Sequence, residues 1–138
     1  MSKELTFTDE LGYLDDPTGI TIPVMLTLGG STIIVAAKVD TGAEVCLFGR
    51  IHGEELGLRI EQGIPKVMNT LSGSLESFGH EVVIQTGQLA FHSLVYFAKY
   101  PGLPRNILGR QGWLRSLKLG VVDYDNLLYL SPYDSKSS

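Results

Sequence analysis

Apolar and polar side chains alternate along much of this chain with the period of two that is typical of β-strands. Turn-forming residues, glycine above all, separate the alternating segments. We expect strands over residues 20–28, 31–39, 64–69, 75–85, 88–98, 119–122 and 127–130. The strand at 31–39 is β-branched and mostly apolar, so we expect it to be buried on both faces. The pattern predicts an all-β domain.

Two segments depart from the strand pattern. Residues 50–56 can form a short helix that Gly57 would end as a C-cap. Residues 112–117, which include Trp113 and Leu114, give the stronger signal, and here we expect the one short helix of the fold.

The chain shows no linker and no solenoid repeat, so residues 1–138 are expected to form a single domain. Residues 1–13 are weakly patterned, and they can be an arm that packs on the body or a removable pro-segment. Residues 134–138 are polar and are expected to form a loose tail.

Composition narrows the class of protein further. Hydrophobic residues make up 43% of the chain, enough for a core, and sixteen glycines fit many tight turns. The net charge of -4 argues against nucleic acid as a partner. No apolar run can span a bilayer, and the N-terminus has no apolar signal core, so neither a membrane partner nor secretion is indicated. The single cysteine, Cys46, fits a reducing compartment, and we expect a cytoplasmic protein.

One stretch carries the strongest chemical signal. The apolar, β-branched run at residues 33–35 begins a stretch that leads into Asp40, Thr41, Gly42 and Ala43. A carboxylate at the end of a buried strand is costly unless it is hydrogen-bonded or takes part in chemistry. Taken alone, however, Asp-Thr-Gly is also ordinary turn chemistry, and that explanation is the more frequent one.

Two later features bear on that choice. Residues 66–80 form a predicted hairpin with long arms and a small, polar tip, which is either an exposed loop or a mobile cover over a site. Farther along, Ile107, Leu108, Gly109 and Arg110 form a second apolar-apolar-glycine stretch.

With these three elements in this order, residues 20–130 resemble the retropepsin-like aspartic proteases. Family members place an apolar-apolar-glycine segment beneath the catalytic loop, and their flap hairpin lies between the two in the sequence. The chain departs from viral members at Glu44-Val45, where they carry two acids, and at the hairpin tip, where only Gly73 is a glycine. Its closing hairpin at 121–130 is more similar to that of cellular members.

The resemblance implies a closed barrel with a flap hairpin and one short helix, functional as a homodimer. Asp40 would be catalytic, and because the chain has one Asp-Thr-Gly, the second acid would come from a second copy. Thr41 would brace the loops across the interface, Gly42 would present its carbonyl to a peptide substrate, and Ala43 would leave room beside the carboxylate. Glu44 could pair with Arg110, although two solvated charges are the plainer alternative.

The flap residues are the candidates for substrate contacts, and simple packing on the body is equally open for each. They are Met68, Leu71, Ser72, Gly73, Ser74, Leu75 and Phe78.

Other chemistries have weaker support. His52, His80, His92 and Cys46 lack the spacing of metal ligands, and no phosphate-binding loop is present, so we expect no metal and no cofactor. Two alternatives to a protease stay open. One is an inactive dimer of the same fold that binds peptides or scaffolds a partner. The other is a generic β-barrel binding module, in which the match at 107–110 would be accidental.

Overall fold

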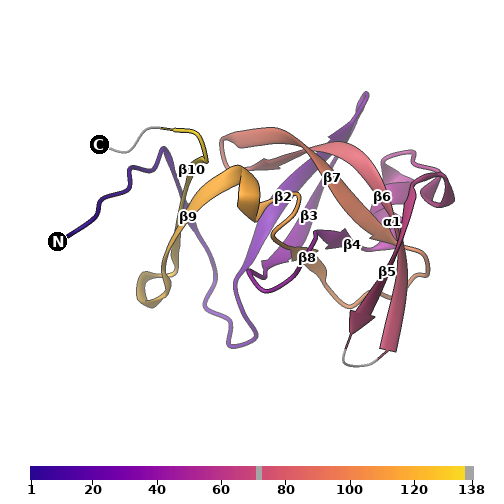
Figure 1. The fold of residues 1–138 in the computed structure, drawn as a ribbon, viewed down its shortest axis with the longest axis horizontal. Helices are drawn as coiled ribbons and strands as arrows, with labels where there is room; N and C mark the ends of the chain where they lie inside the picture. Colours follow the sequence, from indigo (N-terminus) through magenta and orange to yellow (C-terminus); the bar gives the residue numbers. More distant parts are fainter. Residues whose placement is uncertain (71–72, 136–138) are drawn as a thin grey trace.

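Most of the chain is β-structure in a computed structural model that describes residues 1–70 and 73–135 (Figure 1). The strands are β1 (Asp9–Gly12), β2 (Thr21–Leu28), β3 (Ser31–Val39), β4 (Leu47–Phe48), β5 (Ile64–Thr70), β6 (Gly73–Thr86), β7 (Leu89–Ala98), β8 (Asn106–Leu108), β9 (Leu117–Val122) and β10 (Leu127–Pro132). The helical elements are α1 (Arg50–Glu55) and the 3₁₀ turns η1 (Ile60–Gln62), η2 (Leu114–Ser116) and η3 (Asp123–Asp125).

Six strands close into a barrel. The larger sheet has the order β2-β3-β8-β4-β7-β6-β5, and a further pairing of β2 with β6 joins its ends and leaves β5 outside. The closing contact sets Leu26 opposite Ile84, and both side chains are fully buried. β5 therefore pairs only with β6, and the two strands extend from the barrel as a hairpin (Figure 1). The predicted all-β closed barrel is confirmed.

β8 is short, but it occupies the centre of the sheet. It runs parallel to β3, with Val39 opposite Leu108, and antiparallel to β4, with Leu47 opposite Ile107. The chain thus inserts a late segment between two early strands, which brings residues 40–46 and 107–111 together.

The expectation that β3 is buried on both faces is wrong. Val35 and Ala37 lie in the core, whereas Ile34 is 70% exposed and Ala36 is also exposed. Composition misled here because apolar residues fill both sides of the strand, yet the closed barrel has its core on one side only.

The helix was expected in the wrong place. Among the described residues the α-helix is α1, and Gly57 follows it with φ +85°, as the C-cap pattern predicted. The segment 112–117 has only the turn η2.

Gly112 and Trp113 explain why residues 112–117 do not form the expected helix. Gly112 has φ +96°, a left-handed conformation that cannot start a helix. Trp113 is fully buried, so the backbone follows the position of the indole in the core instead of winding through 112–117.

A second sheet has the order β1-β10-β9. The preceding arm continues this pairing, because the Thr8 N–H donates to the Leu130 carbonyl (3.0 Å). Asp9 ties the arm to the barrel through a hydrogen bond from the Gln88 N–H (2.6 Å). At the other end of the chain the Ser135 N–H donates to the Pro132 carbonyl (3.1 Å), and residues 136–138 of the predicted tail lie outside the described residues.

A buried hydrogen bond fixes the centre of the core. The indole Nε1–H of Trp113 donates to the hydroxyl of Thr86 at 2.9 Å, and both residues are 0% exposed. A buried donor without a partner keeps the cost of its lost hydration.

We expect Thr86→Val to lower the free energy of unfolding by about 1–3 kcal/mol, because it keeps the shape of the side chain and removes the acceptor. Chemical denaturation of both proteins measures the difference. The matched control is Thr21→Val at an exposed position of β2, which should change stability by less than about 0.5 kcal/mol. Equal effects of the two substitutions would contradict the importance of this bond.

Candidate active site

Asp40 lies at the point where β3 meets β8. Its N–H donates to the carbonyl of Leu108 (2.9 Å), which extends the parallel ladder by one residue beyond β3. The chain then turns at once, because the Ala43 N–H donates to the Asp40 carbonyl (3.1 Å) and the Gly42 N–H donates to its Oδ1 (3.1 Å). The carboxylate is therefore held by its own loop while it stays partly open to solvent.

The segment after β8 supports this loop from below. Arg110 N–H donates to the Ala43 carbonyl (2.9 Å), and Gln111 N–H donates to the Glu44 carbonyl (2.8 Å). A parallel β-bridge between Val45 and Gln111 extends the contact. The two stretches that the sequence singled out are therefore joined through their backbones.

Gly109 makes this contact possible. A Cβ at this position would lie 2.2 Å from the carbonyl oxygen of Val45 and 2.9 Å from that of Ala43. Both neighbours are backbone atoms and cannot rotate away, so only glycine allows this approach. The Gly109 N–H points to the Sγ of Cys46 (3.4 Å).

Cys46 is part of this support and not a nucleophile. Its side chain is fully buried, and that burial raises the pKa of the thiol to about 12, although the Gly109 N–H acts against the shift. The thiol therefore stays protonated at physiological pH.

Residues that flank the carboxylate lie at the surface of the single chain. Thr41 and Gly42 are exposed, and Arg110 is exposed as well. Leu108 and Gly109 beneath them are buried, and Ile107 is half-buried. The site therefore has a buried floor, and the residues that flank the carboxylate above it are exposed.

The pair register shows which flap residues face that floor. Ile107, Leu47 and Tyr96 are successive partners across β8, β4 and β7, on the face opposite the core. Tyr96 pairs with Gly79 of β6, so the odd-numbered residues of β6 continue this face. Leu75 and its partner Met68 therefore lie on this outward face, which carries Ile107, Leu47 and Tyr96 and is the groove face. Gly73 lies on it as well, opposite Thr70.

Phe78 and Ser74 belong to the other face. Phe78 pairs with the fully buried Phe97 and packs against the core, so of its two alternatives the structure shows packing on the body and not a substrate contact. Ser74 is exposed at the end of the hairpin, opposite Asn69. Leu71 and Ser72 lie outside the described residues.

The predicted pair of Glu44 with Arg110 is also wrong within this chain. The Glu44 carboxylate instead accepts from the ammonium of Lys66 on β5, at 3.0 Å. Lys66 shares the groove face with Met68, so the pair links the base of the hairpin to the loop of Asp40. Because Glu44 is 72% exposed, we expect this pair to contribute to position more than to stability.

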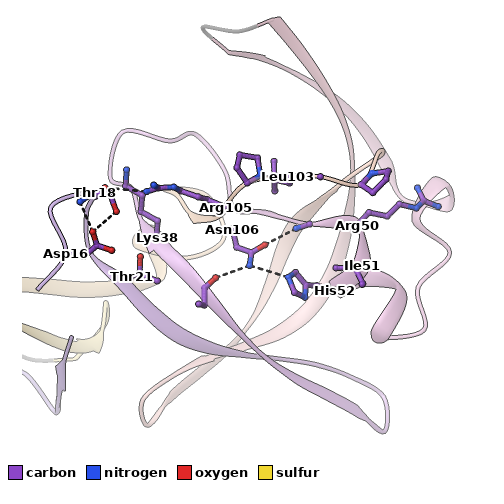
Figure 2. Close-up of a pocket in the computed structure, with 15 residues that line it drawn as sticks. Asp16, Thr18, Thr21, Lys38, Arg50, Ile51, His52, Leu103, Arg105 and Asn106 are labelled. Atoms are coloured by element: carbon purple, nitrogen blue, oxygen red, sulfur yellow. Dashed lines mark hydrogen bonds between the residues drawn. The ribbon is translucent and has the colours of Figure 1, made fainter. Parts of the chain in front are cut away.

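On the side away from Lys66, a cleft of about 570 Å³ opens between the end of β3, the start of α1 and the loop 101–105 (Figure 2). Asn106 fixes its floor: its Oδ1 accepts from the Gly49 N–H (2.9 Å) and its Nδ2 donates to the Ala36 carbonyl (2.9 Å). Lys38 and Arg105 lie along one wall (Figure 2). At the rim, hydrogen bonds from the N–H and the hydroxyl of Thr18 lower the pKa of Asp16.

The chemistry available here is that of one carboxylate that is held by its own loop and is partly open to solvent. Within residues 1–70 and 73–135, no cluster of His, Cys, Asp or Glu could hold a metal ion. His52, His80 and His92 stay apart, since His80 bonds to the Ile60 carbonyl and His52 lies by Asn106. No helix in the described part of the chain is long and apolar enough to cross a membrane.

This arrangement, an acid loop over an inserted apolar-apolar-glycine strand with a hairpin beside it, defines a retropepsin-like architecture. Similar solved structures include a retropepsin-like aspartic protease from Rickettsia conorii, with a TM-score of 0.67 and 16% identity over 88% of this chain and 98% of that one. The EIAV protease complexed with the inhibitor HBY-793 has a TM-score of 0.51 and 22% identity over 65% of this chain and 80% of that one. At these identities the likeness shows the fold, and the predicted retropepsin-like fold is confirmed.

No protein-family model and no curated protein matches the sequence. The family resemblance thus rests on the short motifs and on the fold.

Sequence reasoning missed Lys38, Lys66 and Tyr96. The period of two could have found Lys38, because a residue two positions before Asp40 in a strand shares its face. Lys66 and Tyr96 depend on strand register, which the sequence alone does not give.

We expect Gly109→Ala to destabilise the protein by about 2–4 kcal/mol, because the added methyl group meets backbone atoms of the Asp40 loop. Thermal and denaturant unfolding measure the loss. Gly30→Ala is the matched control, since a Cβ there meets nothing within 4 Å, and it should cost less than about 1 kcal/mol. If Gly109→Ala were as stable as this control, the close approach would not hold in solution.

Proposed function

We propose that this protein is an aspartic endopeptidase that works as a homodimer, with Asp40 of each copy forming the catalytic pair. The observation that carries the proposal is the construction of the Asp40 loop. The Asp40 carboxylate accepts from the Gly42 N–H and the Asp40 backbone is fixed by the ladder bond to Leu108, yet the residue remains partly open to solvent. A carboxylate that served only as a turn former would not require the inserted strand and Gly109 beneath it.

The need for a second copy follows from the chemistry. Peptide hydrolysis by carboxylates uses one ionised group to take a proton from water and one protonated group to polarise the carbonyl. The chain has one Asp-Thr-Gly, and the exposed Thr41 and Gly42 beside Asp40 leave a surface on which a symmetry-related loop can pack. In the single chain, no hydrogen bond joins the Thr41 hydroxyl to another described residue, so it is free to bond across such an interface.

The proposed substrate is an extended peptide. The groove face between the Asp40 loop and the β5–β6 hairpin carries Met68 and Leu75, which would cover the peptide, and Ile107, which would form the floor. The exposed backbone of Gly42 would bond to the peptide main chain, and alternate side chains would enter the clefts on either side. We propose a cytoplasmic location, in which the free, buried Cys46 stays reduced.

Subunit mixing tests the shared pair. Asp40→Asn changes shape little and should fold and dimerise without cleaving. Mixed in equal amount with wild type and allowed to exchange, it should leave about a quarter of the dimers with two acids. Cleavage per wild-type chain should then fall by about half.

Asp15→Asn, in the N-terminal turn, is the control and should leave cleavage unchanged in the same mixture. Undiminished activity per wild-type chain after proven exchange would show that each chain works alone. A wild-type protein that binds peptides but releases no products would favour the inactive scaffold instead.

The pH profile gives a separate test. Because the two carboxylates must share one proton, kcat/KM should follow a bell-shaped curve with an acidic to mildly acidic optimum. Initial rates on one peptide between about pH 3 and pH 9 measure the curve. A rate that rises steadily into the alkaline range would exclude this dyad.

A further inference from the structure

Lys38 lies on the same face of the sheet as Asp40. In β3 the odd-numbered residues Val35 and Ala37 are buried in the core, so the even-numbered residues point outward. The ladder bond from the Asp40 N–H to Leu108 keeps the strand geometry through Asp40. Two residues along a strand span about 7 Å, so the Lys38 side chain starts one side-chain length from the candidate catalytic acid.

Lys38 also lines the cleft at the end of β3. Lys38 is half-buried on its wall, and the guanidinium of Arg105 lies nearby with its Nη1 donating to the Thr18 carbonyl (3.4 Å). Figure 2 shows both side chains at the same end of the cleft, with Leu103 above and His52 and Ile51 at the opposite end. The lining thus combines apolar and proline surface with three cations, Lys38, Arg105 and Arg50, and with the Asp16 carboxylate on the rim.

The positive charge of this wall is only partly offset inside the chain. Among the described residues, no hydrogen bond or ion pair joins the Lys38 ammonium to a carboxylate. The Asp16 carboxylate on the rim accepts from Thr18 (2.9 and 2.8 Å), and these hydrogen bonds, helped by the charge of Arg105, lower its pKa. No ion pair joins it to Lys38 or Arg105 in the described part of the chain.

Arg50, the third cation of the cleft, is already paired with carboxylates of this chain. Its guanidinium binds both oxygens of Glu61 at 2.6 and 2.8 Å and also donates to the Lys99 carbonyl at 2.7 Å. Glu54 adds a second carboxylate at 3.4 Å. Lys38 and Arg105 are therefore the cations that a ligand in the cleft can use.

We propose that Lys38, assisted by Arg105, binds an acidic side chain of the peptide substrate close to the scissile bond. This inference rests on the proposed function, because it takes the ligand of the cleft to be part of the peptide held over Asp40. An aspartate or glutamate would place its methylene groups against Leu103 and the prolines of loop 101–104 and its carboxylate against the ammonium. Lys38 is then a specificity residue of the protease.

The plain alternative is a lysine that only keeps the strand end soluble. Such a lysine would make no distinction between glutamate and glutamine in a substrate. A partly desolvated ammonium that binds a carboxylate gains a charge-assisted hydrogen bond, and we expect a preference of about five- to tenfold for glutamate. The preference should shrink as salt is raised, because the cleft is open to solvent.

The test compares peptides that differ only in carrying Glu, Gln or Lys at one position within three residues of the cleaved bond. Wild type should cleave the Glu peptide about five- to tenfold faster in kcat/KM than the Gln peptide, at one such position. Lys38→Met should remove the difference, and Lys38→Glu should favour the Lys peptide. Arg105→Gln should reduce the preference in part.

Lys3→Glu on the exposed N-terminal arm makes the same change in net charge as Lys38→Glu, but outside the cleft, and should keep the wild-type preference. Cleavage that shows no difference between Glu and Gln at any of these positions would overturn the inference and leave the proposed function standing.

A binding measurement separates the two ideas if cleavage is absent. The Asp40→Asn variant should bind the Glu peptide more tightly than the Gln peptide by a similar factor, and the double variant Asp40→Asn, Lys38→Met should not. Selective binding without any cleavage by wild type would reject the protease but keep the acidic subsite. Absence of both selective binding and cleavage would reject the acidic subsite together with the protease.

Discussion

The close approach of Gly109 to the carbonyl groups of Ala43 and Val45 is the constraint on which the rest of this structure depends. A Cβ at this position would overlap both backbone groups, so no other residue permits β8 to lie directly beneath the Asp40 loop. The approach joins segments that are more than sixty residues apart in the sequence. It also explains why the loop can hold a carboxylate at the surface without disturbing the core, since Cys46 and Leu108 fill the space below it.

Barrel closure places the Asp40 loop on the same outward surface as residues of several other strands. Since one side of the closed sheet faces the core, every second residue of β3, β8, β4 and β7 must face outward. The Asp40 loop, Ile107, Tyr96 and the inner side of the β5–β6 hairpin therefore share one continuous surface. The continuity of this surface from the Asp40 loop to the hairpin follows from strand pairing alone.

Charge is distributed unevenly along this groove. On one side of Asp40 the Lys66 ammonium is paired with Glu44, which ties the hairpin to the floor. On the other side Lys38 has no such partner among the described residues, while Arg50 is held by Glu54 and Glu61. An unpaired cation beside a paired one is a physical basis for selectivity, because only the first gains a new interaction from a ligand.

The sequence by itself determined most strands and the turns at Gly29 and Gly57, because periodicity and glycine chemistry are local. The association of Asp40 with residues 107–110 was predicted from the family resemblance, since no local pattern gives so distant a contact. Three features were decided only by the tertiary structure. The exposure of Ile34 depends on which side of the closed sheet is covered, and the packing of Phe78 against the core depends on strand register. The pairing of Glu44 with Lys66 depends on two segments that meet only after folding. Local patterns give a strand two faces, and only packing decides what each face contacts.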